Sequence, residues 1–486
     1  MPLTRILLFL LPAIPLLLGG CATNPVTGRS DFVLISEAQE ISLGRRYNTK
    51  ILEEIPRYDD PELQALVQQV GTRLAAHSHR ADLIYRFTVL DSTAVNAFAL
   101  PGGYIYITRG MLAYLNSEAE MAAVLGHEIG HVTARHSVRQ QTTATVTDLL
   151  GAVVTASTGV QGVDTLTDFL GTAVVRGYGR EHELEADRLG AEYLARSGYD
   201  PEAMLQVVGI LKNQETFESE VAKKEGREPN VYHGLFSTHP DNDARFREVV
   251  MAANRYKTPA TTHRGRDEFL HALDGLVFGD SPRDGIVRNN HFYHRDMNFA
   301  LTFPEGWRIE NRPKKLVSLA RGNDGLIQVT VAERNKRIAP AQFMLQRMGL
   351  DNLRQGRPFE VAGLTGYTAV AAAGTPWGQR AARFVVLFRD DTAFIFAAAA
   401  RDRDHARKYD DAVESTAASL HSLTAAERRL ATGKKLVIVP ARRGMRYAAL
   451  ARESPLTNYP EEQLRLINDQ YPEGEPRPPR LIKLVR

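Results

Sequence analysis

The sequence predicts an α+β protein, mainly helical in its first half and built on antiparallel strands in its second. Over residues 37–80, apolar residues recur every three or four positions, which is the spacing of helices with one buried face. After about residue 284 the pattern changes to short alternating apolar runs such as FALTFP, LIQVTVAE and TAFIFAAAA, typical of half-buried strands. The length of 486 residues suggests roughly three domains at about 150 residues each.

Composition excludes several classes of protein. Hydrophobic residues make up 43% of the chain and charged residues 24%, which excludes collagen-like, disordered and multi-span membrane proteins. The single cysteine, Cys21, excludes an internal disulfide framework, a cysteine-rich zinc site and a cysteine-ligated iron–sulfur cluster. Lysine and arginine total 60 against 57 aspartates and glutamates, a net charge of +3. This balance gives no indication of a nucleic-acid partner.

The N-terminus predicts a processing signal. Residues 6–18, ILLFLLPAIPLLL, carry no charge and follow Arg5. The run is too short to span a bilayer as a helix and is typical of the apolar core of a secretory signal. The following Leu-Gly-Gly-Cys21 resembles a bacterial lipobox, which implies removal of residues 1–20 and lipidation of Cys21. Because Ala22 follows rather than aspartate, the resemblance implies an outer-membrane anchor facing the periplasm; an ordinary signal with an incidental cysteine is the alternative.

The elements up to residue 256 follow from local patterns. Residues 87–107 indicate strands of a small antiparallel sheet around a Pro-Gly-Gly turn, and SEAE at residues 117–120 resembles a capping box that opens a helix to about residue 140. Further helices are expected at residues 181–196, 201–213 and 241–256. Residues 141–176 are rich in Ala, Val, Thr and Gly. They could form a packed helical hairpin, a lid, or a surface for membrane or barrel substrates.

The segment His127-Glu128-Ile-Gly-His131 is an HExxH motif within an amphipathic helical pattern. Residues four apart lie on one face of a helix, one turn apart, so His127 and His131 can bind one zinc ion. Glu128 lies beside them, where it can polarise the attacking water. A buried pair of core histidines is the alternative. The small and apolar residues before the motif, AAVLG at 122–126, argue against a solvated face.

A second helix carries acidic residues that could complete a metal site. A catalytic zinc ion commonly takes three protein ligands and keeps one position open for water. Glu183 and Asp187 are four residues apart, so one could bind the metal while the other accepts a proton from a ligating histidine. Glu185 competes for the role of third ligand. A solvated acidic helix face is the alternative.

Four segments in order resemble metallopeptidase family 48, a group of gluzincin peptidases. They are AVNAFALPGGYIYITRGML, VLGHEIGHVTARHS, REHELEADRLGAEYL and FSTHPDNDARFRE. The resemblance covers about residues 22–256, including the CATNPVTGR start typical of its lipoprotein members. The family contains the CAAX-prenyl proteases, the membrane heat-shock protease and the periplasmic outer-membrane β-barrel assembly-enhancing proteases. A metzincin site is excluded, because Ala134 and Ser137 stand where that motif needs Gly and His.

The resemblance implies an endopeptidase with one Zn²⁺ per chain. It implies that the ligands are His127, His131 and Glu183, that Glu128 is the general base, and that Asp187 orients His127. Glu183 is preferred to Glu185 because the family's ligand lies four residues before the aspartate. His239 and Arg245 would stabilise the oxyanion, with a helix-start residue and a structural ion pair as the alternatives.

The residues before the motif resemble the family's edge strand beside the cleft. They are Asn96, Ala97, Phe98, Pro101 and Gly102. An open strand edge can hydrogen-bond the backbone of an extended polypeptide substrate, whereas an ordinary hairpin is the alternative. His136 and His182 are expected to be surface or packing residues.

The rest of the chain divides into non-catalytic parts. We expect the signal at 1–20, the peptidase domain at 21–256, a linker with a short helix at 257–283, an α+β sheet domain at 284–425 and a small module at 430–486. The sheet domain resembles one found in some of these lipoproteins. The last module resembles a degenerate LysM module, which would contact peptidoglycan; a structural cap is the alternative.

These observations predict a zinc-dependent endopeptidase of the bacterial cell envelope that hydrolyses misfolded or misassembled envelope proteins. Its partners would be polypeptide substrates and the membrane, without nucleic acid. A periplasmic chaperone or assembly factor for outer-membrane proteins with latent protease activity is one alternative. A cell-wall-binding scaffold is another.

Overall fold

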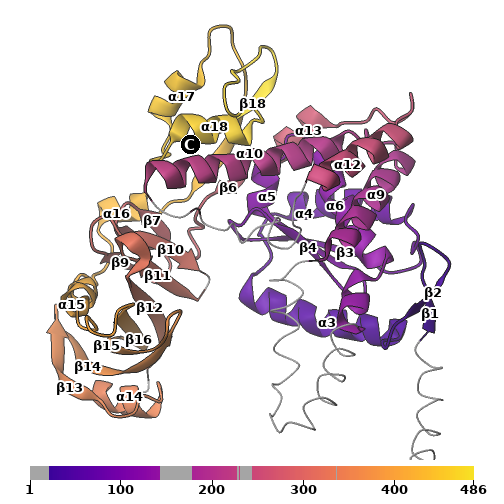
Figure 1. The fold of residues 1–486 in the computed structure, drawn as a ribbon. Coiled ribbons are helices and arrows are strands. Elements are labelled where there is room, and N and C mark those ends of the chain that lie inside the picture. The colour runs from indigo at the N-terminus through magenta and orange to yellow at the C-terminus, as the bar shows by residue number, and fades with distance from the viewer. Residues whose placement is uncertain (1–20, 143–177, 227–228, 230–242, 313, 335–336) are drawn as a thin grey trace, which may run out of the picture. The chain divides into compact units, whose positions relative to one another are not determined.

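The computed structural model describes residues 21–142, 178–226, 229, 243–312, 314–334 and 337–486. It confirms the α+β class, with helices concentrated in the first half and a large antiparallel sheet in the second (Figure 1). The chain forms two compact units, Met1–Phe278 with Lys435–Arg486, and Gly279–Lys434. The expected signal at 1–20, and nearly all of 141–176, lie outside the described residues.

The first unit begins with a hairpin and two capped helices. Strand β1 (Cys21–Thr23) pairs antiparallel with β2 (Ser30–Phe32). Helix α3 (Glu37–Glu54) starts with a capping box in which Ser36 and Gln39 bond each other's backbone nitrogens, and α4 (Pro61–Ala75) starts with Asp60 as its cap. Such side chains satisfy N–H groups that a helix start leaves without partners.

A three-stranded sheet follows, with the order β3-β5-β4. Its strands are β3 (Arg86–Leu90), β4 (Ala97–Leu100) and β5 (Tyr104–Thr108). We expected this sheet to be antiparallel, but it is mixed, because β3 runs parallel to β5 while β4 runs antiparallel to it. Strands β4 and β5 form an antiparallel hairpin, and β5 of that hairpin pairs with β3. Strand β5 is therefore central, and β4 lies at an edge of the sheet.

Helix α6 (Glu118–Thr133) lies at the centre of the unit. Every residue from Ala119 to Thr133 is buried, so the helix is surrounded by protein. Ser117 caps it by accepting a bond from the backbone nitrogen of Glu120. Helices α4, α9 (Arg180–Arg196), α10 (Ala203–Lys224) and α13 (Arg266–Ala272) pack against it (Figure 1). Helix α5 (Arg109–Tyr114) precedes α6 in the chain, and α12 (Asp243–Tyr256) packs on α9 and α10.

The expected helix to about residue 140 is interrupted, and this expectation was wrong. Helix α6 ends at Thr133, and helical structure resumes only from residue 136. Between them Arg135 has a φ of 54°, in the left-handed region that a non-glycine residue adopts at an energetic cost. The break changes the direction of the side chains that follow it.

The C-terminal segment completes the core of the first unit. It runs β17 (Lys434–Pro440), α17 (Tyr447–Glu453), α18 (Pro460–Ile467) and β18 (Leu481–Val485), and its sheet has the order β18-β17-β6, where β6 is Val277–Phe278. Leu436, Ile467 and Leu484 belong to the same buried cluster as Leu125 of α6. The expected division of this region into a peptidase domain, a linker and a LysM-like module remains a prediction.

A buried lysine links the last strand to the start of α6. Lys483 is fully buried, and its Nζ donates to the carbonyl oxygens of Ala113 (2.8 Å) and Leu115 (2.7 Å). Burial lowers the pKa of Lys483 and raises that of nearby Glu120. The Lys483 Nζ thus satisfies carbonyls at the end of α5, directly before the turn that begins α6.

The second unit is a sheet covered on both faces. Its sheet has the order β10-β11-β12-β16-β15-β14-β13, all antiparallel. These strands are Arg308–Arg312, Lys315–Leu319, Gly325–Glu333, Thr392–Ala400, Gly378–Arg389, Leu364–Thr375 and Arg354–Val361 in that order. Val385 and Leu387 face the cluster that includes α15 (Asp410–Ala418), and Phe384 and Val386 face α14 (Pro340–Gln346), as the alternation of strand side chains requires.

The second unit also contains a small meander and one further helix. The meander is β7 (Ile286–Arg288), β8 (His291–His294) and β9 (Phe299–Thr302), and the helix is α16 (Ala425–Leu430). Among the described residues, the side chains that could together hold a metal ion all lie in the first unit.

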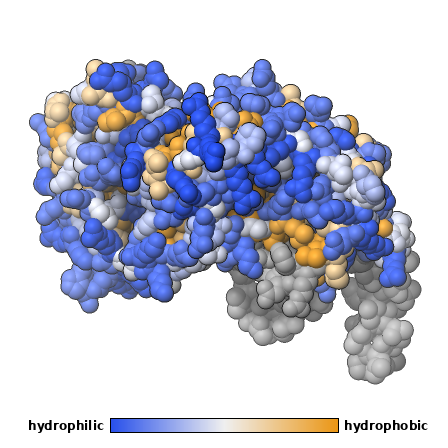
Figure 2. Space-filling model, turned by 90° about the horizontal axis from the view of Figure 1, so that it is seen from above, coloured by the Kyte–Doolittle hydropathy of each residue, from blue (hydrophilic) through white to orange (hydrophobic). Residues whose placement is uncertain are grey.

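Hydrophilic residues cover most of the face shown in Figure 2, with apolar residues in smaller groups between them. The exposed large apolar side chains of the described residues come from separate elements: Leu34, Ile84, Met251, Val331, Leu345 and Leu430. Among the described helices, none combines the length and apolarity needed to cross a bilayer.

Candidate metal centre

Helix α6 places the three polar residues of the HExxH motif inside the first unit. His127 is 5% exposed, Glu128 0% and His131 1%. Because the histidines are one turn apart, their rings meet, and their Nε2 atoms are 3.0 Å apart. Glu128 lies between them in sequence but to one side of both around the helix axis, about 60° from His131 and about 100° from His127.

Helix α9 supplies a carboxylate to the same point. Glu183 is 1% exposed, and its oxygens lie 3.5 Å from His127 Nε2 and 3.5 Å from His131 Nε2. Donor atoms bound at about 2.0–2.1 Å in a tetrahedral site lie about 3.3 Å from one another. The three donor groups therefore fit a tetrahedral metal ion with one position left open. In the described part of the chain this is the one such cluster of histidine, cysteine and acidic side chains.

Asp187, one turn after Glu183 on α9, contacts the other nitrogen of His127. Its Oδ1 lies 2.8 Å from His127 Nδ1. Burial disfavours a charged imidazole here, but the hydrogen bonds and charges of Asp187 and then Glu183 outweigh it and raise the pKa of His127 to about 9. The carboxylates thus create a field that favours positive charge at this point, which a metal ion can also supply.

Small residues allow the two helices to approach this closely. A methyl group added to Gly130 would lie 2.9 Å from the carbonyl oxygen of Ala186, and one added to Gly190 would lie 3.1 Å from the backbone nitrogen of His127. Gly126 faces Leu194 at a similar distance. A larger side chain at these positions would push α9, and with it Glu183, away from the histidines.

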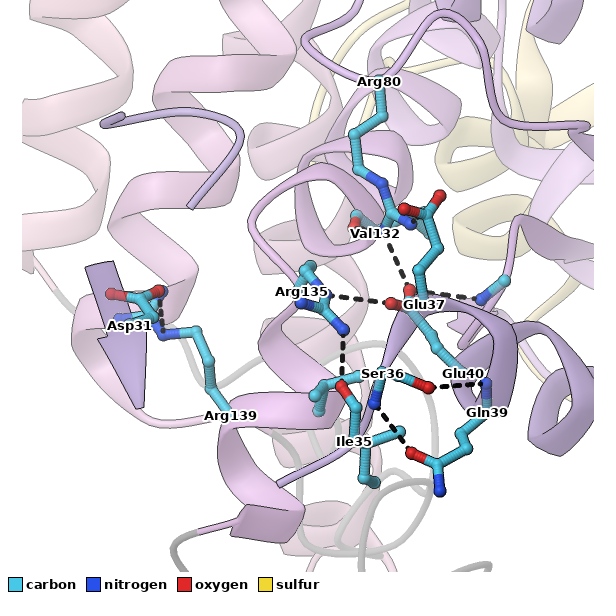
Figure 3. Close-up of polar contacts among 12 residues, drawn as sticks. Asp31, Ile35, Ser36, Glu37, Gln39, Glu40, Arg80, Val132, Arg135 and Arg139 are labelled. Carbon is cyan, nitrogen blue, oxygen red and sulfur yellow. Dashed lines mark hydrogen bonds and ion pairs between the residues drawn. The ribbon is translucent and has the colours of Figure 1, made fainter. Parts of the chain in front are cut away.

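A buried carboxylate fixes the end of α6 to its surroundings (Figure 3). Glu40 of α3 is 1% exposed and accepts bonds from Arg80 Nη1 (2.8 Å) and Arg135 Nε (2.9 Å). Its Oε1 also accepts the backbone N–H of Gly102 at 3.4 Å. One carboxylate therefore connects α3, the left-handed residue after α6 and the turn after β4.

The predicted substrate strand lies at the edge of the small sheet. Ala97 and Phe98 are in β4, while Pro101 and Gly102 form the turn to β5. Asn96 precedes the strand, and its backbone exchanges bonds with Thr108. Strand β4 pairs on one side with β5, and α6 packs close to it. The use of the strand by a substrate remains a prediction.

His136 lies beside the ligand cluster, although the sequence indicated no more than packing. It is fully buried, and its Nδ1 is 2.8 Å from His131 Nδ1. In an unbroken helix these two residues would point about 140° apart. The turn at Arg135 brings them together, and a left-handed arginine leaves no recognisable sequence signal.

Glu185 contacts His136 rather than the ligand histidines. Its Oε2 is 3.0 Å from His136 Nε2 and 3.1 Å from Arg139 Nη1. Burial raises its pKa, but these contacts outweigh burial and lower it to about 2. The geometry thus places Glu183, and not Glu185, at the ligand cluster. The roles assigned to these residues remain predictions.

Three residues of the predicted site and anchor have side chains outside the described part of the structure. His239 is outside the described residues. Arg245 is in α12, and Cys21 is in β1, but the positions of their side chains are not described.

Comparison with known proteins gives one family match and several similar proteins. The model of peptidase family M48 matches residues 61–253. The Beta-barrel assembly-enhancing protease of Escherichia coli (strain K12) is 30% identical over 274 residues, 54% of this chain and 54% of the relative. That of Yersinia pestis is 31% identical over 246 residues, 49% of this chain and 48% of the relative.

A mitochondrial protein is also similar. The Mitochondrial metalloendopeptidase OMA1 of Arabidopsis thaliana is 34% identical over 143 residues, 29% of each chain. The chain spans about half the length of the first two relatives.

Replacing Gly130 by alanine tests the close packing of α6 on α9. We expect Gly130→Ala to lower the free energy of unfolding by about 1–3 kcal/mol, because the added methyl overpacks against a backbone carbonyl. Divalent-metal affinity should fall about tenfold or more, because Glu183 moves with α9. Urea unfolding and a chelator-competition titration measure the two effects.

Gly209→Ala in α10 is the matched control, since a methyl there has no neighbour within 4 Å. It should stabilise the protein by about 0.5–1 kcal/mol and leave metal affinity unchanged. Equal behaviour of the two variants would contradict the packing argument.

Proposed function

Because the model of peptidase family M48 matches residues 61–253, we propose that the protein is a zinc-dependent endopeptidase that hydrolyses misfolded or misassembled proteins of the bacterial cell envelope. The observation that carries this proposal is the buried cluster of His127, His131 and Glu183. Glu128 is buried beside it, on the helix that carries both histidines. Two imidazoles and one carboxylate form a ligand set that catalytic zinc uses.

The residues of the cluster have complementary roles in peptide hydrolysis. A zinc ion held by the three ligands would polarise the scissile carbonyl and lower the pKa of the attacking water. Glu128 takes the proton released when that water attacks, and delivers it to the departing amine nitrogen. Asp187 accepts the Nδ1 proton of His127, which leaves the Nε2 lone pair directed at the metal position.

Stabilisation of the oxyanion is assigned to residues of α12 and the segment before it. A tetrahedral intermediate carries negative charge that donors beside the metal must offset. His239 and Arg245, in the sequence HPDNDAR, supply an imidazole and a guanidinium suited to that role. Their assignment rests on the family resemblance of this motif.

Strand β4 is the proposed binding element for the substrate. It is an edge strand next to α6, and the Glu40 carboxylate holds its turn at Gly102 to the end of α6. An extended polypeptide that pairs with Asn96, Ala97 and Phe98 through main-chain bonds would be held with little dependence on its sequence. This suits an enzyme that acts on unfolded proteins.

A chaperone or assembly factor with latent protease activity is the second candidate. The relatives from Escherichia coli and Yersinia pestis are named for enhancing β-barrel assembly as well as for proteolysis. A cell-wall-binding scaffold is the third, based on the LysM-like sequence after residue 430.

Glu128→Gln tests the proposed mechanism. Glutamine keeps the size of the side chain but cannot accept the proton, so cleavage of casein and of an unfolded barrel protein should fall at least about 100-fold. Bound zinc should stay at one ion per chain, because Glu128 is not a ligand. Glu62→Gln, an exposed residue in the first turn of α4, should cleave normally.

Persisting cleavage by purified Glu128→Gln protein would exclude this mechanism. Wild-type protein that binds the unfolded barrel protein without ever cleaving it would favour the chaperone candidate.

Backbone methylation of a bound peptide tests the role of β4. The Glu128→Gln protein would be titrated with a substrate peptide whose alternate amides are N-methylated, and with the same peptide methylated one residue later. Only one set of amides can face β4, because strand amides alternate in direction. That set should weaken binding about 3–10-fold per methyl group through lost hydrogen bonds, and the other should have little effect. Equal effects of the two sets would refute pairing with β4.

The proposed location is the periplasmic face of the outer membrane, with a lipid anchor at Cys21 and contact with peptidoglycan. In cells given labelled palmitate, the wild-type protein should take up label and Cys21→Ser should not; unlabelled wild type would contradict lipidation.

The full chain should co-sediment with purified peptidoglycan, and absence of the protein from the pellet would contradict that contact. The full chain is needed because residues 435–486 share the core of the first unit.

A further inference from the structure

The two predicted ligand histidines are held by different partners. His127 Nδ1 meets a carboxylate directly, that of Asp187 at 2.8 Å. His131 Nδ1 instead meets another imidazole, that of His136, at the same distance. Ligand histidines need a partner at the second nitrogen to fix the ring and its tautomer. The orientation of the His131 ring therefore depends on what holds His136 in place.

His136 is itself held from its other side. Its Nε2 lies 3.0 Å from Glu185 Oε2, and the same oxygen accepts from Arg139 Nη1 at 3.1 Å. His136 is fully buried, whereas the Glu185 side chain is 17% exposed. The contacts form a chain from His131 through His136 to Glu185 and Arg139, and Arg139 Nε also lies 3.6 Å from Asp31 Oδ2.

The positions of the protons follow from this geometry. A neutral imidazole has one donor and one acceptor nitrogen. His131 directs its Nε2 at the other candidate ligand atoms, so with a metal ion on Nε2 its proton would be on Nδ1 and would be donated to His136. His136 Nδ1 is then the acceptor, its Nε2 carries the proton, and Glu185 accepts that proton. Both ring protons then have an acceptor.

We propose that His136, held by Glu185, is a positioning residue for His131, and that it sets the metal affinity of the site by fixing the orientation and tautomer of that ligand. The proposal rests on the proposed zinc site. It gives Glu185 a role different from that of a third ligand. It also explains why the chain turns at Arg135, since the turn is what brings His136 to His131.

Ring stacking supports the same arrangement. Tyr178 stacks on His131 with centroids 4.0 Å apart, and its hydroxyl lies 2.6 Å from Ser137 Oγ. His182 stacks on His136 at 4.3 Å. Stacking restricts tilting of each ring but leaves rotation within its plane, so the hydrogen bonds decide which nitrogen faces the metal position. His182 provides a control, because it packs on His136 through its ring face.

The experiment measures zinc affinity rather than activity. Wild type, His136→Phe, His136→Gln, Glu185→Ala and His182→Phe would each be stripped of metal and titrated with zinc against a chromophoric chelator. The melting temperature of each metal-free protein would be recorded in parallel. His136→Phe keeps a ring but cannot accept the proton of His131. Glutamine restores one acceptor and one donor.

We expect His136→Phe to raise the Kd for zinc about 10–100-fold, as loss of such partners does. Glu185→Ala should raise it by a smaller factor, His136→Gln should recover most of the wild-type affinity, and His182→Phe should bind zinc normally. Should His136→Phe fail to fold, Glu185→Ala carries the test, since it leaves both rings in place.

Three results would overturn the proposal. Wild-type zinc affinity in both His136→Phe and Glu185→Ala would show that the contact does not position His131. An equal loss in His182→Phe, matched by an equal fall in the melting temperature without metal, would show a general packing effect. Absence of zinc binding by the wild type would refute the proposed metal site as well, which separates the two failures.

Discussion

The close packing of α6 against α9 is the constraint on which the candidate site depends. Neither helix carries a complete set of donors, because α6 supplies two imidazoles and α9 supplies the carboxylates. Gly130 and Gly190 let the backbones approach until Glu183 lies 3.5 Å from both ligand nitrogens. The same approach brings Asp187 to His127, since Glu183 and Asp187 share a helix face. One packing contact therefore determines both the set of side chains at the candidate site and the orientation of His127.

The surroundings of α6 hold this contact in place from both ends of the helix. At the C-terminal end, Glu40 compensates two arginines within the protein, where a lone charge would be strongly destabilising. Before the N-terminal end, Lys483 satisfies the carbonyls of Ala113 and Leu115. Lys483 lies 370 residues after Ala113 in the sequence. The last strand of the chain thus helps to position the start of α6.

The sequence predicted what local spacing determines. The HExxH pair lies four residues apart on one helix, so its geometry follows from helical periodicity alone. The mixed sheet, the break after Thr133 and the buried Lys483 could not be predicted, because each depends on distant partners. A lysine between apolar residues in LIKLV indicates an exposed position on an edge strand, and only tertiary contacts reveal that it is buried. Likewise, His136 acquires its contact with His131 from a left-handed residue that Glu40 of α3 stabilises.

The charge of the cluster connects folding of the first unit to cation binding. Glu128, Glu183 and Asp187 are each at most 1% exposed, and burying carboxylates is unfavourable unless positive charge compensates them. The carboxylates of Asp187 and Glu183 raise the pKa of His127 for the same reason, since positive charge is favoured at this point. A divalent ion supplies twice the charge of a proton at the point where the ligand atoms converge. Since folding is what brings α6 and α9 together, the free energy of metal binding also stabilises their contact.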